Sequence, residues 1–333
     1  MSKQTDKAII VDRLVKNFEV VEKEKGVWGN ISSLIRPNRK TVRALKKISF
    51  SLEQGELVGF IGPNGAGKTT TLKILSGLLH PTAGFTQVLG FYPWERKQDF
   101  IKNISLEKEK KNQLWWDLPA IETFELNKAI YEIPDKEYEK SLDELVEMLE
   151  VGKLLNRQVR RLSLGQRMRL ELVAALLHKP KVLFFDEPTI GLDVVGQQKM
   201  RDFVFDYNKR HNATILLTSH NMDDLIDLAK RVVVIDQGQI LFDGDLKDLV
   251  KKFAKEKIIK ISLAKETDFR LFESVGKLRK ADFPQVILSV PRETAAVAAA
   301  EILQNAPVAD LNIEEEPIEE IIRQVFRGET EQK

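Results

Sequence analysis

Short apolar runs alternate with amphipathic stretches along the first 250 residues of this chain. Runs rich in β-branched and aromatic residues that are too short for helices predict strands, whereas apolar residues at helical spacing predict helices. Strands that alternate with helices favour an α/β core with a mostly parallel sheet. The predicted strands are 8–12, 48–52, 57–61, 182–185, 214–218, 232–235 and 239–242, and the predicted helices are 70–79, 121–130, 138–149 and 163–178.

The pattern changes near residue 250, where a charged link leads into a shorter mixture of strands and helices. The tail is acidic, and Pro317 opens a helix with apolar residues on one face. We therefore expect two domains, residues 1–250 and a small α+β domain of residues 251–333, with a helical insertion in the first over about 115–178. In the second domain the predicted elements are strands 258–263 and 285–290 and a helix over 294–304.

Composition sets outer limits on the class of protein. The 333 residues are 43% apolar and 31% charged, which is an ordinary globular mixture. No apolar run reaches the ~18 residues of a bilayer-spanning helix, and residues 1–6 lack a signal peptide's apolar core. The absence of cysteine excludes disulfides, and a net charge of +2 gives no argument for nucleic-acid binding. Residues 19–42 are polar and basic and predict a long surface excursion.

One glycine-rich turn carries the clearest chemistry. It lies between an apolar strand and a helix and has the spacing GxxxxGK[ST], so that backbone N–H groups and a helix N-terminus face phosphate oxygens. Lys68 can reach the β- and γ-phosphates, and the Thr69 hydroxyl can ligate Mg²⁺. The turn therefore predicts nucleotide binding through Gly62, Pro63, Asn64, Gly65, Ala66, Gly67, Lys68, Thr69 and Thr70.

An apolar strand over 182–185 ends in two carboxylates, Asp186 and Glu187. The strand can hold Asp186 beside the phosphate loop, where the carboxylate would orient Mg²⁺ through a coordinated water. Glu187 is then placed to polarise the attacking water. A pair of surface acids at a strand end is the simpler alternative, and the loop upstream favours the functional interpretation.

The run Leu162-Ser163-Leu164-Gly165-Gln166 precedes the acidic strand. In this order the motifs resemble the nucleotide-binding subunit of ATP-binding cassette (ABC) transporters, whose signature is usually LSGGQ; here Leu164 stands at its third position. The resemblance identifies residues 188–193 as the D-loop with Asp193 as its acid, and His220 as the switch histidine at the γ-phosphate. Five motifs in the family's order carry this resemblance over residues 8–250.

The resemblance implies a P-loop NTPase core with a RecA-like parallel-sheet lobe, an antiparallel N-terminal β subdomain and an inserted helical subdomain. It implies ATP and Mg²⁺ as cofactors, held partly by a second subunit. Ser163, Gly165 and Gln166 would face the γ-phosphate bound by that subunit, so that two chains sandwich two ATP molecules head to tail. Phe18 is the best match for an adenine-stacking aromatic residue, with core packing as the alternative.

The QLWWDLP run and the LSLGQ signature look like one exporter branch of the family, whose members pair with a separate six-helix permease. The resemblance implies an ATPase subunit at the cytoplasmic face of a membrane, partnered by that permease and by a second copy or a paralogous cassette, with no nucleic acid. Trp115 and Trp116 would suit an anchor for the permease, or would pack inside the helical insertion. The transported substrate, the direction of transport and the role of 251–333 are not encoded in recognisable motifs.

One family motif is altered. Aligned on the run Gln113–Pro119, the glutamine of the family's Q-loop falls at Lys110, and 107–111 carries charges that suit a buried central strand poorly. The stretch is either a solvated charge run, for which Gln113 substitutes, or a natural or engineered change that weakens coupling or hydrolysis. A weakly hydrolysing regulatory cassette and a non-transport ABC ATPase therefore remain alternatives, although residues 70–161 leave no room for the coiled coil of DNA-repair members.

Overall fold

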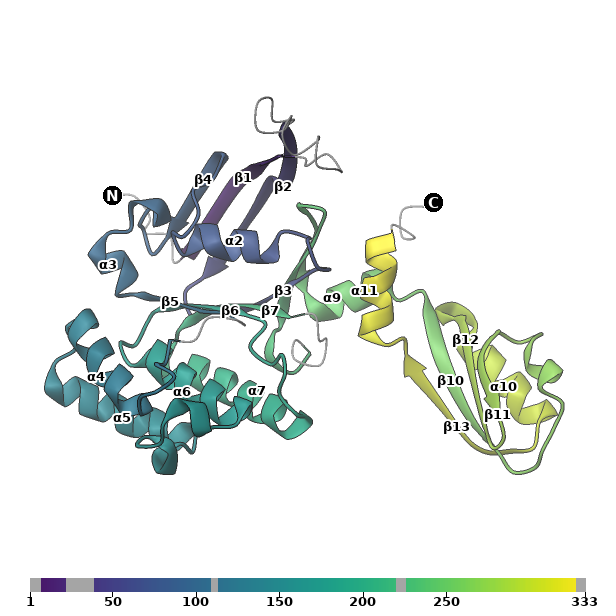
Figure 1. The fold of residues 1–333 in the computed structure, drawn as a ribbon. Coiled ribbons are helices and arrows are strands. Elements are labelled where there is room, and N and C mark those ends of the chain that lie inside the picture. The colour runs from purple at the N-terminus through teal and green to yellow at the C-terminus, as the bar shows by residue number, and fades with distance from the viewer. Residues whose placement is uncertain (1–6, 22–38, 109–112, 220–225, 328–333) are drawn as a thin grey trace, which may run out of the picture. The chain divides into compact units, whose positions relative to one another are not determined.

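The computed structural model describes residues 7–21, 39–108, 113–219 and 226–327. The chain forms two compact units, residues 1–244 and residues 245–333 (Figure 1). Each unit buries an apolar core of its own. The second unit therefore begins earlier than residue 250. Within the four described ranges, no helix is both long enough and apolar enough to cross a bilayer.

A six-stranded sheet runs through the centre of the first unit. In spatial order its strands are β5 (Ile104–Lys108), β6 (Val182–Asp186), β7 (Thr214–Ser219), β3 (Leu57–Ile61), β8 (Arg231–Asp236) and β9 (Gln239–Asp245). The pairs from β5 to β8 are parallel, and β9 follows β8 through a turn at Gln237 and Gly238. Strands β6, β7 and β3 are buried, which explains their continuous apolar runs. Their carboxyl ends meet at one edge of the sheet.

A three-stranded antiparallel sheet accompanies the central one. It consists of β2 (Arg39–Glu53), β1 (Lys7–Val21) and β4 (Ala83–Val88), in that order. The helix α2 (Lys68–Leu75) contacts strands of both sheets and lies between them in Figure 1. This arrangement confirms the α/β core and the antiparallel N-terminal subdomain. The surface excursion expected over 19–42 is wrong at both ends, because β1 continues to Val21 and β2 begins at Arg39; residues 22–38 lie outside the described part.

Four longer helices cover the other face of the central sheet (Figure 1). They are α4 (Ala120–Tyr131), α5 (Asp135–Met148), α6 (Leu164–Leu176) and α7 (Val194–His211). The first three confirm the predicted helices, and α4 and α5 both contact α6. We did not predict α7, since amide and charged residues interrupt an apolar stripe of which only part is buried. A short helix, α3 (Gln98–Ile101), leads into β5.

The charged stretch after residue 104 forms a strand in spite of its composition. Strand β5 pairs with β6 on one side only, since it is the last strand of the sheet. An edge position tolerates charges that a central strand does not. The charged residues of β5 are therefore compatible with a strand, because β5 lies at the edge of the sheet and not at its centre. Lys110 itself lies outside the described residues.

The second unit is an antiparallel sheet with one helix packed on a face. Its order is β11 (Lys277–Asp282), β12 (Gln285–Pro291), β10 (Glu256–Leu263) and β13 (Val308–Glu315), and the helices are α9 (Leu246–Phe253), α10 (Ala295–Asn305) and α11 (Ile318–Arg327). Helix α10 supplies Ala298 and Ile302 to the core, and α9 contacts α11. Two expectations are corrected here, because α9 and β10 occupy most of the charged link over 251–257 and β13 occupies the acidic tail.

Candidate functional site

The phosphate loop crosses from the end of β3 to the start of α2 at the carboxyl edge of the sheet. Gly67 has a φ of +116°, and a Cβ there would lie 2.7 Å from the Leu45 side chain, so glycine is required. The backbone N–H of Ala66 donates to the Pro63 carbonyl at 3.1 Å, and the Ala66 carbonyl accepts from Gly238 at 2.9 Å. The turn between β8 and β9 therefore holds the loop in place. Pro63, Asn64 and Gly65 are exposed at its outer side.

Lys68 is buried inside this loop. Its Nζ donates to the carbonyl oxygens of Gly62 and, at 3.3 Å, Pro63, and lies 3.8 Å from Oε1 of Glu187. Burial lowers the pKa of Lys68, and the charges of Glu187 and Asp186 oppose that effect. The ammonium group is thus held within the curl of the loop beside two carboxylates, where it can respond to a phosphate anion.

Thr69 and Asp186 meet across the edge of the sheet. The Thr69 hydroxyl donates to the Asp186 carboxylate, 3.0 Å from Oδ2 and 3.3 Å from Oδ1. A hydroxyl and a carboxylate oxygen are the hard ligands that Mg²⁺ prefers, and protein sites for this ion commonly supply only one or two of them. The pair therefore fits a magnesium ion that arrives with a nucleotide.

Glu187 follows β6 in a strained conformation. Its φ is +60°, in the left-handed region that residues other than glycine rarely adopt. Its N–H points at both the carbonyl and the hydroxyl oxygen of Thr218, each at 3.1 Å. These contacts stabilise the turn that keeps the Glu187 side chain near Lys68.

Thr218 is the residue at this edge that sequence reasoning missed. It is 0% exposed, pairs with Asp186 in the β6–β7 register, and donates its hydroxyl to Asp186 Oδ1 at 2.8 Å. One hydroxyl therefore binds the Asp186 carboxylate and accepts the Glu187 N–H. The only signal in the sequence is its place at the end of an apolar strand, beside the predicted His220, which lies outside the described residues.

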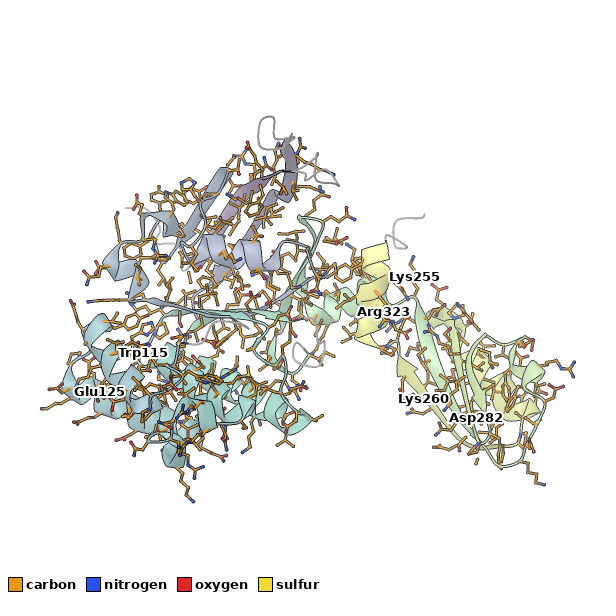
Figure 2. The ribbon with its side chains drawn as sticks, in the orientation of Figure 1. Trp115, Glu125, Lys255, Lys260, Asp282 and Arg323 are labelled. Carbon is orange, nitrogen blue, oxygen red and sulfur yellow. The ribbon has the colours of Figure 1, made fainter. Side chains whose placement is uncertain are left out.

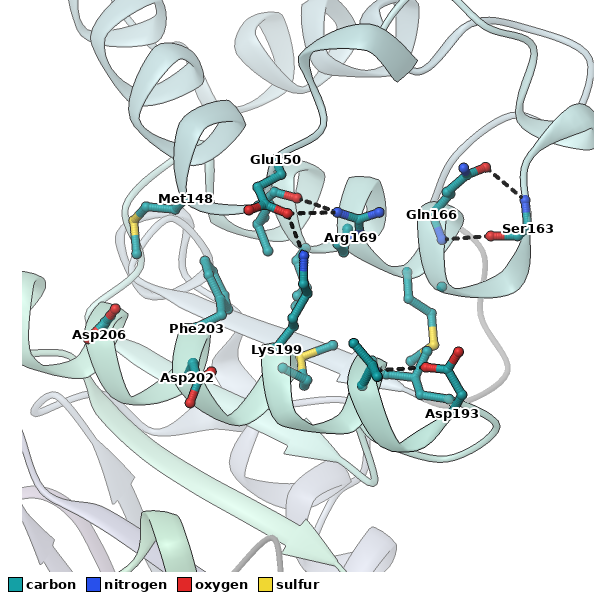
Figure 3. Close-up of a pocket in the computed structure, with 18 of the residues that line it drawn as sticks. Met148, Glu150, Ser163, Gln166, Arg169, Asp193, Lys199, Asp202, Phe203 and Asp206 are labelled. Atoms are coloured by element: carbon teal, nitrogen blue, oxygen red, sulfur yellow. Dashed lines mark hydrogen bonds and ion pairs between the residues drawn. The ribbon is translucent and has the colours of Figure 1, made fainter.

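The signature residues form the start of α6. Ser163 is the N-cap of this helix, and it exchanges hydrogen bonds with Gln166: its Oγ accepts from the Gln166 N–H at 3.3 Å, and its N–H donates to Gln166 Oε1 at 3.1 Å. Asp193 caps α7 through a single bond, in which Oδ1 accepts from the Gly196 N–H at 2.7 Å. Both caps, together with Gly165, line a cavity of about 590 Å³ (Figure 3).

The predicted site residues thus fall into two groups. The phosphate loop lies with Asp186 and Glu187, whereas the residues lining the signature cavity include none of the phosphate loop. The residues that line that cavity are partly apolar, and two of them, Glu150 and Lys199, form an ion pair (Figure 3). In this single chain the signature and Asp193 therefore do not complete the phosphate site.

Three aromatic residues belong to neither group. Phe18, on β1, is partly buried and lies under the Lys16 ammonium group, which is 5.1 Å from its ring centre. Trp115 and Trp116 are 57% and 50% exposed, so the alternative that they pack inside the helical insertion is wrong. Trp115 is labelled in Figure 2. The Arg167 guanidinium lies 5.4 Å from the Trp116 ring centre.

Comparisons with known proteins cover both units. A family model described as "ABC transporter" matches residues 45–190, and one described as "EvrA-like ABC transporter, C-terminal domain" matches 255–314. The chain is 30% identical over 234 residues to the ABC transporter ATP-binding protein NatA of Bacillus subtilis, covering 70% of this chain and 95% of that protein. It is 32% identical over 213 residues to the bacitracin transport ATP-binding protein BcrA of Bacillus licheniformis, covering 64% and 68%. Against ABC transporter A family member 1 of Dictyostelium discoideum it is 32% identical and spans only 26% of that protein, for 69% of its own length.

Solved structures share the fold. An ATP-binding subunit of an ABC transporter superposes with a TM-score of 0.60 at 23% identity, covering 74% of this chain and 93% of that one. An ATP-binding cassette in a dimeric, post-hydrolysis state bound to ADP and Pi superposes with a TM-score of 0.58 at 22% identity, covering 71% and 98%. At these identities the likeness concerns the fold.

Proposed function

This chain belongs to the family of ABC transporter ATP-binding proteins, which are ATPases, and we propose that it hydrolyses ATP in a head-to-tail dimer to drive a separate membrane permease. One observation carries the proposal. The phosphate loop and the acidic end of β6 meet at one edge of the parallel sheet, where Thr69 binds Asp186 and Lys68 lies beside Glu187.

In the proposed reaction the loop binds the phosphates of ATP. Lys68 exchanges the carbonyl oxygens of Gly62 and Pro63 for β- and γ-phosphate oxygens, while the backbone N–H groups of the loop and the N-terminus of α2 bind the rest. Burial of the ammonium group strengthens this attraction, since fewer waters screen it. Phe18 is the residue that we propose for stacking on adenine.

Thr69 and Asp186 would hold Mg²⁺. When bound, the ion would neutralise charge on the phosphate oxygens. Glu187 polarises the water that attacks the γ-phosphate, and the contacts of Thr218 keep its backbone in the required turn. We assign His220 to the γ-phosphate as well.

A second copy of the chain, or a paralogous cassette, would complete each site. We propose that Ser163, Gly165 and Gln166 approach the γ-phosphate held by the partner, together with Asp193. The separation of these residues from the phosphate loop within one chain supports that arrangement. Such a dimer forms when ATP binds the closed state better than the open one.

The partner that we propose is an integral-membrane permease of the exporter type, which would place the chain at the cytoplasmic face of a membrane. Exposed Trp115 and Trp116 suit an anchor for it, since aromatic residues dominate many interface hot spots. The name of BcrA refers to bacitracin transport, which supports a transport role without giving the substrate of this chain. Purification from native membranes should recover a bound permease, whereas recovery of ribosomes or DNA would contradict the transport role.

Replacing Glu187 by glutamine tests the reaction itself. The amide cannot take a proton from water, so ATP turnover should fall by about 10²–10⁴-fold while ATP binding is kept. ATP should then trap the variant as a dimer, which light scattering after gel filtration measures. Glu147, an exposed acid on α5, supplies the control, because Glu147→Gln should change neither property. Unchanged turnover in Glu187→Gln would remove this residue from its role.

A further inference from the structure

Glu171 is a buried acid on the helix that begins with the signature motif. It is 4% exposed, and its neighbours on α6, Leu170 and Leu172, are buried apolar residues. A buried carboxylate costs free energy unless it is well bonded, and apolar side chains of similar size often replace it without loss of stability. The proposed reaction does not use Glu171. The presence of a buried acid at this position therefore needs another explanation.

The bonds of Glu171 reach a segment far away in the sequence. Its Oε2 accepts the backbone N–H of Gln113 at 2.8 Å, and its Oε1 accepts that of Leu114 at 3.3 Å. These two residues directly precede Trp115 and Trp116. One carboxylate therefore holds two successive peptide groups and fixes the position of the chain as it enters the helical insertion.

Gln113 extends the connection to the central sheet. Its side-chain N–H donates to Oε2 of Glu107 at 3.0 Å, and Glu107 pairs with Phe185 in the β5–β6 register, one residue before Asp186. A continuous path of hydrogen bonds thus leads from α6 through Gln113 to the strand beside Asp186. At a rise of ~1.5 Å per residue, Glu171 is about 12 Å along α6 from Ser163.

The two acids share one environment. Burial raises the pKa of Glu107 to about 8, with the nearby charge of Glu171 adding to the effect and the Gln113 bond opposing it. Burial also raises the pKa of Glu171, but its two backbone N–H bonds and the charge of Arg167 favour the ionised form. The carboxylate of Glu171 is thus the one that the two peptide N–H groups stabilise in its ionised form, whereas burial favours the protonated form of Glu107.

We propose that Glu171 is a positioning residue that ties the Gln113–Leu114 segment to the signature helix, so that the strand edge beside Asp186 and the signature motif respond together to nucleotide. The response to nucleotide rests on the proposed function. The two hydrogen bonds from the N–H groups of Gln113 and Leu114 to Glu171, which we call the Glu171 clamp, lie within one chain.

The first test uses the full chain without nucleotide. Glu171→Gln keeps the shape of the side chain but has one acceptor oxygen in place of two and no charge. Amide hydrogen exchange should rise by roughly tenfold at Gln113 and Leu114 and should also rise in residues 163–170. Glu316→Gln is the matched control, because Glu316 is a buried glutamate of the second unit and its replacement should leave both segments unchanged. Unchanged exchange at 113–114, or a rise there without one in 163–170, would overturn the proposal.

The second test adds Mg²⁺ and the non-hydrolysable analogue AMP-PNP. In the unaltered protein we expect slower exchange in both 62–71 and 163–170. In Glu171→Gln the protection of 62–71 should persist and that of 163–170 should be lost, a result that a general loss of stability would not give. Equal protection of 163–170 in both proteins would refute the clamp.

The two arms separate this inference from the function on which it rests. If AMP-PNP does not protect 62–71 in the unaltered protein, the proposed nucleotide site is refuted. The measurement without nucleotide still tests whether Glu171 holds the segment 113–114. If Glu171→Gln does not fold, Glu171→Asp replaces it, since the shorter side chain keeps the charge and withdraws the carboxylate from the two N–H groups. The same rise in exchange at both segments is then expected.

Discussion

A single hydroxyl group orders the carboxylates of the candidate site. Thr218 donates to Asp186, which would hold the metal, and accepts from the N–H of Glu187, whose left-handed backbone would otherwise relax. The hydroxyl is fully buried, so no water replaces it when it is removed. The role that we propose for Glu187 would therefore depend on a residue from the neighbouring strand.

Thr218→Val keeps the shape of the side chain and removes only the hydroxyl group. Loss of a buried hydrogen bond of this kind costs about 1–3 kcal/mol, and we expect ATP turnover to fall by roughly 10–100-fold with little change in nucleotide affinity. Steady-state ATPase assays and binding of a fluorescent ATP analogue measure the two quantities. Thr218→Ser should restore turnover. Equal turnover in the valine variant would show that Asp186 and Glu187 hold their positions without Thr218.

The functional role of a single residue can be predicted from the sequence where that role depends on residues close to it in the chain. The phosphate loop needs its glycines and Lys68 in one short turn, so the motif can be read from adjacent letters. Thr218 and Glu171 are different, because each acts on residues that only the folded chain brings near. No local pattern marks a threonine at a strand end or an acid within an apolar helix as functional.

At the level of elements, burial decides what the sequence reveals. Strands β6 and β7 were predicted because they are buried and therefore apolar throughout. The charges of strand β13 predict an acidic tail, but in the structure Glu314 pairs with Lys260 on β10 and Glu315 pairs with Arg292, residues remote in sequence. Charges that pair across a sheet are indistinguishable locally from charges in solvent.

Strand β5 leads to a prediction about pH. Burial raises the pKa of Glu107 to about 8, from about 4.5 in the unfolded chain. Between these values the folded state binds a proton that the unfolded state has released, so the free energy of unfolding should decrease as pH rises from about 5 to 8. Glu107→Gln should remove that decrease and add stability on the order of a few kcal/mol at pH 8.

Denaturant unfolding at several pH values measures this effect. The exposed Glu147 provides the comparison, because Glu147→Gln should retain the decrease seen in the unaltered protein. A decrease of the same size in Glu107→Gln would mean that another group is responsible.

The position after β5 carries a second prediction. By resemblance Lys110 occupies the place of the family's Q-loop glutamine, and we expect Lys110→Gln to raise ATP turnover several-fold if that change weakens hydrolysis. Lys111→Gln removes an equal charge one residue later and should have no such effect. Equal turnover in all three proteins would favour a solvated charge run.

On the scale of the whole molecule, the residues of the candidate site lie in one of the two units. The phosphate loop, Asp186, Glu187 and the signature all lie in the first unit, and within the described ranges the apolar cluster around α2 and the two sheets contains no residue of the second unit. The family model that matches the second unit is a separate one from that matching the first. The second unit thus has its own sheet and its own apolar core.

A chain that ends at Asp245, the last residue of β9, tests this division. Because the first core and the phosphate site are built without residues 246–333, we expect the shortened protein to fold and to bind a fluorescent ATP analogue with a Kd within about threefold of the full chain, or about 0.7 kcal/mol. Lys68→Ala in the same shortened chain should abolish tight binding, which shows that the signal comes from the phosphate loop. A folded but non-binding shortened protein would mean that the second unit helps to form the nucleotide site.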